Sequence, residues 1–240
     1  MKINEIQNPV KIGIKTTKQN IDQKIKVPAP FFQKPSVYVI AGAMGSGKST
    51  LVNSLMTGKG ENQVFRGVFE RVHYATPEEV FTSDENHPMK KHNPNHLHHE
   101  LTPNLLVSIM ESAIDEKADG GATMVVLDDY GEILKNKHIE PLLKRMVQKH
   151  RHLKINLIIT VISLKLLPRS IRSLVDMYFI FKPKNKLEVE DYVENVFSLP
   201  KKDYEHVYDA VYKEKHDFMI YNQRDHEFYR NFNRLEITGD

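Results

Sequence analysis

The chain has no cysteine among its 240 residues. Neither a disulfide framework nor a cysteine-based metal site is therefore available, and a reducing compartment is the natural setting. No stretch approaches the ~20 apolar residues that a membrane-spanning helix needs, and the first residues lack the apolar segment of a signal peptide. We therefore expect a soluble, intracellular protein with no membrane partner.

Two signatures of other nucleotide-dependent proteins are also missing. Residues 136–139 read Asn-Lys-His-Ile, so the guanine-recognition sequence N-K-x-D of G-protein switches does not occur there or elsewhere. The signature L-S-G-G-Q of transporter ATPases is absent as well. These absences disfavour both classes.

What the sequence does contain is a complete phosphate-binding loop. Residues 42–49 read Gly-Ala-Met-Gly-Ser-Gly-Lys-Ser and directly follow the apolar run 37–41. In such a loop backbone N–H groups cradle phosphates, the lysine (Lys48) reaches the β and γ phosphates, and the following hydroxyl (Ser49) can ligate Mg²⁺. ATP and Mg²⁺ are the expected cofactors. The predicted nucleotide-binding residues are Gly42, Ala43, Met44, Gly45, Ser46, Gly47, Lys48, Ser49 and Thr50.

A second motif is the apolar run 123–127, which ends in two adjacent acids, Asp128 and Asp129. It matches a Walker B segment, in which a carboxylate beside the phosphate loop holds Mg²⁺ through its water shell. Neighbouring residues of a strand point to opposite sides, so the two acids have different roles. We assign Asp128 to the metal and Asp129 to orienting and deprotonating the attacking water, with Glu132 as the alternative base.

Hydrophobic periodicity predicts alternating strands and helices. Strands separated by helices imply a mostly parallel sheet flanked by helices, and with the phosphate loop this is the α/β fold of a P-loop NTPase. The expected strands are 36–41, 68–74, 123–128, 155–162 and 176–181, and the expected helices are 48–57, 103–117, 138–150 and a short one near Ser170.

Three ranges organise the chain. Residues 1–35 are expected to form an extended, partly strand-forming arm, residues 36–183 the ATPase core, and residues 184–240 an extension packed on the core as a small helical and hairpin cap. Within the core, residues 76–100 read as a long surface excursion. Its histidines are not accompanied by a cysteine or by an H-E-x-x-H pattern. We therefore interpret them as residues of a solvated loop and not as the ligands of a metal site. They are His87, His92, His96, His98 and His99.

Residues 133–172 carry ten lysines and arginines against the single acid Glu140. Two interpretations are open: a solvated helix face with loops, or contact with polyanions, either DNA phosphates or the ATP of a neighbouring subunit. The basic residues are Lys135, Lys137, Lys144, Arg145, Lys149, Arg151, Lys154, Lys165, Arg169 and Arg172.

The end of strand 155–162 is a candidate sensor of the γ-phosphate. In additional-strand NTPases this strand lies between the phosphate-loop strand and the Walker B strand, and a polar group at its end has that role. Thr160 and Ser163 are the candidates, and either hydroxyl could equally bond the backbone.

Several blocks of the sequence resemble the poxvirus-type DNA-packaging ATPases, a group of the FtsK–HerA superfamily found in large DNA viruses and virophages. The blocks are Pro-Phe at 30–31, Leu-Asp-Asp-Tyr-Gly at 127–131, and the segments 151–160, 167–173 and 228–232. The resemblance implies the additional-strand sheet. It also implies a homo-oligomeric ring, expected to be hexameric, that hydrolyses ATP between subunits and pumps double-stranded DNA into a preformed capsid without reading sequence.

The resemblance further implies capsid vertex proteins as partners and the viral factory in the host cytoplasm, or the virion, as the location. The family's arginine pattern maps onto Arg151 and Arg172 as trans-acting fingers, whereas Arg169 is left to DNA or to the surface. One departure is Ile162, where the family usually has glutamine. Either Thr160 takes over sensing, or the coupling of hydrolysis to motion differs. The alternative function is a P-loop kinase of small molecules or nucleotides, which does not usually need the paired acids.

Overall fold

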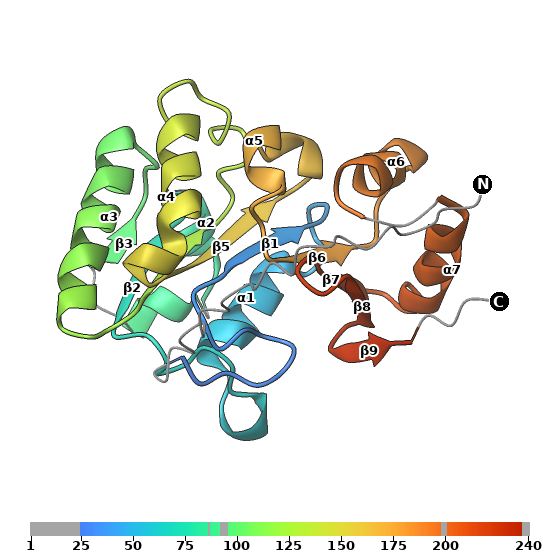
Figure 1. Ribbon diagram of the computed structural model, residues 1–240, viewed down its shortest axis with the longest axis horizontal. Coiled ribbons are helices and arrows are strands. Elements are labelled where there is room, and N and C mark those ends of the chain that lie inside the picture. The colour runs from blue at the N-terminus through green and yellow to red at the C-terminus, as the bar shows by residue number, and fades with distance from the viewer. Residues whose placement is uncertain (1–24, 86, 92–95, 198–200, 237–240) are drawn as a thin grey trace, which may run out of the picture.

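The computed structural model describes residues 25–85, 87–91, 96–197 and 201–236, and these residues form one nine-stranded sheet (Figure 1). The strand order is β3-β2-β4-β5-β1-β6-β7-β8-β9. In chain order the strands are β1 Val37–Ala41, β2 Arg71–Ala75, β3 Leu97–His98, β4 Thr123–Leu127, β5 Ile155–Val161, β6 Met177–Phe181, β7 Phe218–Asn222, β8 Glu227–Arg230 and β9 Asn233–Leu235.

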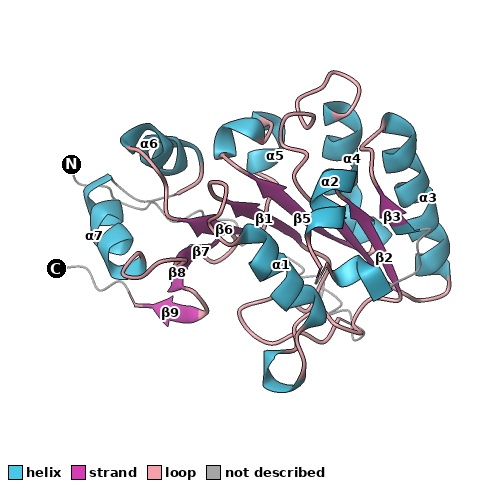
Figure 2. Ribbon diagram, turned by 180° about the vertical axis from the view of Figure 1, so that it is seen from behind, coloured by secondary structure: helices cyan, strands magenta, loops and turns pink. Residues whose placement is uncertain are grey.

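The six strands from β3 to β6 are parallel, and helices cover both of their faces. The helices α3 (Pro103–Ala118), α4 (Glu140–Leu153) and α5 (Arg169–Arg172) lie on one face, and α1 (Lys48–Thr57) lies on the other (Figures 1 and 2). Every residue of β1 is buried because its side chains alternate between these two layers. Val37, Val39 and Ala41 pack in the core with α3 and α4, whereas Tyr38 and Ile40 pack with α1.

The arrangement of β1, β5 and β4 positions the candidate site. β5 pairs with β1 on one side and with β4 on the other. The predicted mostly parallel α/β fold is therefore confirmed, with the additional strand between the phosphate-loop strand and the strand of the paired acids. The predicted elements agree with the observed ones to within a few residues, and the predicted helix 48–57 matches α1.

The predicted C-terminal helical and hairpin extension is confirmed, but its last three strands continue the central sheet rather than cap it. β7 pairs antiparallel with β6, and β8 and β9 follow in the same manner. The segment therefore extends the central sheet, accompanied by α6 (Lys186–Asn195) and α7 (Lys201–Val211). The reason is that its aromatic side chains complete the core on both sides of the sheet, as Tyr221 and Phe218 do. The division into ranges 1–35, 36–183 and 184–240 stays a prediction.

Two other segments correct the sequence-based expectations. Residues 76–100 are not simply a surface excursion, because they contain α2 (Glu78–Ser83), a 3₁₀ helix at Pro88–Lys91 and the edge strand β3. Residues 25–35 of the predicted arm form no strand, and Ile25 and Phe31 are buried against α1 and β1. Residues 1–24 lie outside the described residues. Within the described part of the chain, no helix is long and apolar enough to span a membrane.

Candidate active site

The phosphate loop leaves the carboxyl end of β1 and runs directly into α1. Gly42 is packed so closely that a Cβ atom there would lie 2.6 Å from Cβ of Phe181. Gly47 has φ 112°, a left-handed conformation that favours glycine, and as the N-cap of α1 it offers no side-chain hydrogen bond. The backbone N–H groups of the first turn are therefore left for an external acceptor, as phosphate binding requires.

Lys48 is folded back over this loop. Its ammonium donates hydrogen bonds to the carbonyl of Gly42 at 2.7 Å and to that of Ala43 at 3.2 Å. Burial lowers the pKa of the Lys48 ammonium, and the negative charges of Asp129 and Asp128 counteract part of this lowering. The loop lysine and the paired acids are therefore electrostatically coupled, as a shared phosphate and metal site requires.

The two acids at the end of β4 have different environments. Asp128 is buried, with 3% exposure, whereas Asp129 is more accessible and has φ 63°. Burial raises the pKa of both carboxyl groups, and the charge of Asp128 raises that of Asp129 further. Both acids lie beyond the end of β4, and the left-handed backbone at Asp129 gives the two carboxylates different surroundings.

A hydrogen-bond network fixes Asp128. The Thr160 hydroxyl donates to Asp128 Oδ1 at 2.6 Å, and the Tyr74 hydroxyl donates to Asp128 Oδ2 at 3.1 Å. The Thr160 oxygen also accepts the backbone N–H of Asp129 at 2.9 Å. Both hydroxyls oppose the effect of burial on the pKa of Asp128 because they stabilise its ionised form.

The donors around Asp128 fit Mg²⁺. This ion prefers oxygen ligands and is usually held by one or two carboxylates together with substrate phosphates and waters. The described residues contain no group of three or more His, Asp or Glu side chains that could hold a metal by themselves. One buried carboxylate, Asp128, and the hydroxyl of Ser49 at the start of α1 are the matching donors near the loop.

The hydrogen bonds of Thr160 and Ser163 distinguish these two candidates for the γ-phosphate sensor. Thr160 is buried and bonded to both acids, whereas the Ser163 hydroxyl accepts the backbone N–H of Lys165 and caps a 3₁₀ turn. Ile162, which replaces the family's usual glutamine, is 41% exposed. Of the two sensor candidates, only Thr160 therefore contacts the predicted catalytic groups.

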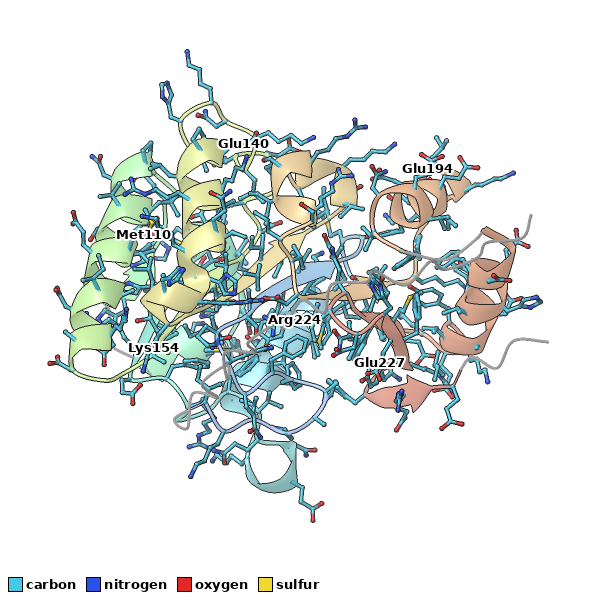
Figure 3. The ribbon with its side chains drawn as sticks, in the orientation of Figure 1. Met110, Glu140, Lys154, Glu194, Arg224 and Glu227 are labelled. Carbon is cyan, nitrogen blue, oxygen red and sulfur yellow. The ribbon has the colours of Figure 1, made fainter. Side chains whose placement is uncertain are left out.

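Arg151 lies at the other end of the sheet from the phosphate loop, where β5 and β6 begin. Its side chain is 52% exposed, and its guanidinium lies 3.6 Å from Asp176. Arg224, labelled in Figure 3, is the closer partner of Asp176, with Nε donating to Oδ1 at 2.6 Å. Arg151 is therefore accessible and remote from the phosphate loop of its own chain.

Arg172 differs from the expectation of a free, trans-acting side chain. It is 6% exposed, and its guanidinium donates to the carbonyls of Leu164 and Leu167 at 2.9 and 3.2 Å. It also forms an ion pair with Asp191 at 3.3 Å, which links α5 to α6. The physical reason is that a buried guanidinium needs several acceptors, and this chain supplies them internally.

The described histidines of residues 76–100 differ in exposure: His87 is buried, His96 and His98 are half-buried, and His99 is exposed. His87 is 4% exposed and contacts the rings of Tyr74 and Phe81. His98 stacks on His73 of β2, and burial lowers the pKa of His73 to about 3, so this ring is neutral. These ring contacts lie beside the edge strand β3. His92 lies outside the described residues.

Sequence reasoning missed two contacts of the site. Tyr74 reaches Asp128 because β2 lies beside β4, although the two residues are 54 positions apart in the chain, and no local pattern predicts that pairing. His216 Nδ1 donates to the carbonyl of Ser46 at 2.9 Å, which joins the C-terminal segment to the phosphate loop. An isolated histidine before a strand carries no signal of this contact.

Fold and site together define a P-loop NTPase fold of the additional-strand type. A family profile described as Poxvirus A32 protein matches residues 29–196, which is more than half of the chain. The chain belongs to this family, and the resemblance seen in the sequence is confirmed. A comparison with curated proteins finds no match.

Solved structures with the same fold include viral packaging NTPases. The DNA-packaging ATPase B204 from Sulfolobus turreted icosahedral virus has a TM-score of 0.62 and 13% identity, covering 85% of this chain and 100% of that chain. B204 from Sulfolobus turreted icosahedral virus 2 in complex with ATP-gammaS has a TM-score of 0.57 and 13% identity, covering 84% and 98%. EssC (ATPases 2 and 3) from Geobacillus thermodenitrificans has a TM-score of 0.56 and 13% identity, covering 85% of this chain and 40% of that chain.

Proposed function

We propose that this protein is an ATP-driven translocase of double-stranded DNA that packages a viral genome into a preformed capsid. The observation that carries the proposal is the convergence of Lys48, Asp128 and Thr160 at the carboxyl ends of β1, β4 and β5. The matched family and the fold shared with viral packaging NTPases support the same conclusion.

The proposed roles follow from the environment of each side chain. Backbone N–H groups of residues 42–50 and the Lys48 ammonium bind the phosphates, and Asp129 orients the attacking water and accepts its proton. Ser49 and Asp128 hold Mg²⁺, which when bound neutralises charge on the phosphates. Thr160 senses the loss of the γ-phosphate through its hydrogen bonds with both acids.

We propose a homo-oligomeric ring, expected to be hexameric, with ATP between adjacent subunits. The accessible guanidinium of Arg151 supports a trans-acting role, because it is half-exposed and cannot reach the loop of its own subunit. A neighbour's arginine typically raises phosphoryl-transfer rates by roughly 10³ to 10⁵. We do not propose Arg172 as the arginine that acts on the neighbour's ATP, because the acceptors of its guanidinium lie within its own chain.

Basic loops at the carboxyl ends of the strands are the proposed DNA contacts. Lys135 and Lys137 lie between β4 and α4, and Lys165 follows β5; all three are exposed. Contacts of this kind bind phosphates without reading sequence and weaken steeply with salt. Double substitution Lys135→Gln and Lys137→Gln should reduce DNA-stimulated hydrolysis while basal hydrolysis stays unchanged. The salt slope of DNA binding should fall by about 1 per lysine that contacts a phosphate.

Steady-state release of phosphate from ATP tests the proposal, with duplex DNA in one arm and candidate nucleosides in another. DNA stimulation supports the motor, and stimulation by nucleosides alone would establish the kinase alternative. Lys48→Ala should abolish ATP hydrolysis without unfolding the chain. The control Lys117→Ala, on the exposed side of α3, should leave the rate of hydrolysis unchanged. Unchanged hydrolysis in Lys48→Ala would rule out the proposed site.

The viral factory in the host cytoplasm and the virion are the proposed locations, with capsid vertex proteins as partners. Electron microscopy of the purified protein with duplex DNA and an ATP analogue tests the assembly directly. A ring around DNA supports the translocase, whereas monomers under these conditions would contradict it.

A further inference from the structure

A cavity of about 910 Å³ opens beside the phosphate loop. Gly47 and Thr50, at the start of α1, line one end of it, so the cavity is continuous with the proposed phosphate site. Its other walls come from the N-terminal segment at 28–31, from the loop after α1, and from the C-terminal segment. Its volume lies in the range of about 300 to 1,000 Å³ that is typical of small-molecule sites.

One wall of this cavity is aromatic. Phe232 is 46% exposed although it belongs to a cluster of rings. Its ring packs edge-on against Phe218, with 5.5 Å between centroids, and lies 6.1 Å from the ring of Phe31. An accessible ring, braced on two sides by buried rings, is a preformed surface for stacking a flat ligand.

His216 holds this wall against the phosphate loop. Its Nδ1 donates to the carbonyl of Ser46 at 2.9 Å, and its backbone has φ 72°, a conformation that non-glycine residues rarely adopt. A Cβ atom at Gly47 would lie 3.6 Å from the same nitrogen. The C-terminal segment therefore fits closely to the loop, and the ring of Phe232 is kept within reach of a ligand that starts at Thr50.

We infer that this cavity receives the nucleobase of the triphosphate bound by the loop and that Phe232 stacks on it. The inference rests on the proposed function, because it takes the phosphates to lie at residues 42–50. The three residues that form the wall and its anchor, His216, Phe218 and Phe232, lie outside the range 29–196 that matches the family. The base site of this chain is thus completed by a segment beyond the matched range.

The absence of tryptophan from the chain makes a direct test possible. Phe232→Trp introduces the only tryptophan of the chain into the wall of the cavity, and a stacked base should quench its emission, which selective excitation separates from that of the tyrosines. ATP is expected to quench this fluorescence, whereas inorganic tripolyphosphate, which has no base, should bind without quenching. As a control, Leu187→Trp places the fluorophore on α6, where the native side chain is 65% exposed, and ATP should leave its emission unchanged.

Phe232→Ala is the complementary variant. The affinity for ATP should fall by about tenfold because one base-stacking contact is lost, while the affinity for tripolyphosphate stays unchanged. Phe232→Tyr keeps the ring and should restore ATP binding. Unchanged ATP affinity in Phe232→Ala, or ATP binding by calorimetry without quenching in Phe232→Trp, would overturn the base site and leave the proposed function standing. Failure of the unmodified chain to bind ATP would overturn both.

Discussion

The Thr160 hydroxyl donates a hydrogen bond of 2.6 Å to Asp128, which directly follows β4, and Thr160 itself lies near the end of the neighbouring strand β5. The same hydroxyl oxygen accepts the backbone N–H of Asp129 at 2.9 Å. One side chain of β5 thus fixes the carboxylate proposed for the metal and the backbone of the residue proposed as the base. A change in the position of either acid is therefore passed to Thr160 through these hydrogen bonds. This link is the physical basis for the proposed sensor.

Replacing Thr160 by valine tests this link, because valine keeps the shape and removes the hydroxyl. The turnover number should fall about 10- to 100-fold, as for other groups that orient metal ligands. The KM for ATP should change little, because the phosphate loop is untouched. Steady-state kinetics at saturating Mg²⁺ separates the two parameters.

The matched control is Thr160→Ser, which retains the hydroxyl and should recover most of the turnover. An equal loss in the serine and valine variants would mean that the methyl group, and not the hydrogen bonds, is what matters. Thermal unfolding of both variants checks that lost activity is not lost folding.

The dependence of activity on pH should show the coupling between Lys48 and the acids. Burial and the charge of Asp128 raise the pKa of Asp129, so a base at this position is lost as pH falls, at a higher pH than for an ordinary carboxyl group. Burial lowers the pKa of Lys48, so its charge is lost as pH rises, at a lower pH than for an ordinary lysine. We expect kcat/KM to decline on both sides of neutrality.

Phosphate release measured across the pH range tests this expectation, with circular dichroism at each pH to confirm that the chain stays folded. An acid limb at the ordinary carboxyl pKa would argue against Asp129 as the base. In Asp129→Asn, the remaining activity should lose the acid limb, since the group that titrates there has been removed.

The parallel part of the fold was predictable because its elements carry strong local signals. Apolar runs such as 123–127 and 155–161 are buried on both faces, and the loop at 42–49 marks the end of β1. The phosphate loop after β1 and the paired acids after β4 therefore lie at the same edge of the sheet. The family resemblance supplied the position of the inserted strand, which periodicity alone does not give.

The remaining features depend on contacts between distant segments, and local patterns do not encode them. Nothing in the sequence around Arg172 distinguishes it from an exposed arginine. Its guanidinium is buried because Leu164, Leu167 and Asp191 supply hydrogen-bond acceptors for it. His87 likewise became a core residue because Tyr74 and Phe81 enclose it. The C-terminal aromatics predict packing, but their pattern does not say whether they cap a sheet or extend it.

Arg172 and Arg151 should respond differently to the same substitution. Arg172→Met leaves Asp191 without its buried partner and should lower the free energy of unfolding by about 3 kcal/mol, because breaking a buried pair strands a charge. Arg151→Met should cost little stability, because its pair with Asp176 is half-exposed and Arg224 remains in place. Urea unfolding measures both values.

Mixing experiments separate the catalytic consequences of these two substitutions. Arg151→Met subunits added to unmodified subunits should inhibit hydrolysis more than in proportion to their share, as expected for a group that serves the neighbour's site. Proportional loss would exclude Arg151 from a trans role. Folded Arg172→Met subunits should show proportional loss, and a disproportionate effect there would restore Arg172 as a candidate.

Asp217 should hold the turn that presents His216 to the phosphate loop. Its carboxylate accepts the backbone N–H groups of Lys213 and Glu214, at 3.1 and 2.8 Å. The Arg230 guanidinium donates to it at 2.9 Å, and so does the side-chain amide of Asn231, at 2.9 Å. Asp217→Asn removes the charge while keeping the shape, and should lower the free energy of unfolding at neutral pH by about 2 kcal/mol.

The dependence of this effect on pH has a definite sign. Burial opposes ionisation of Asp217, yet the hydrogen bonds from Asn231, Glu214 and Arg230 lower its pKa below the ordinary value. A lowered pKa means that the stabilisation is complete above the unfolded-state pKa and is lost as pH falls through the folded-state pKa. The difference between Asp217→Asn and the unmodified chain should therefore shrink under acid conditions, whereas Asp209→Asn, at an exposed position of α7, should change stability little at any pH. A destabilisation of Asp217→Asn that does not vary with pH would show that geometry, and not charge, secures the turn.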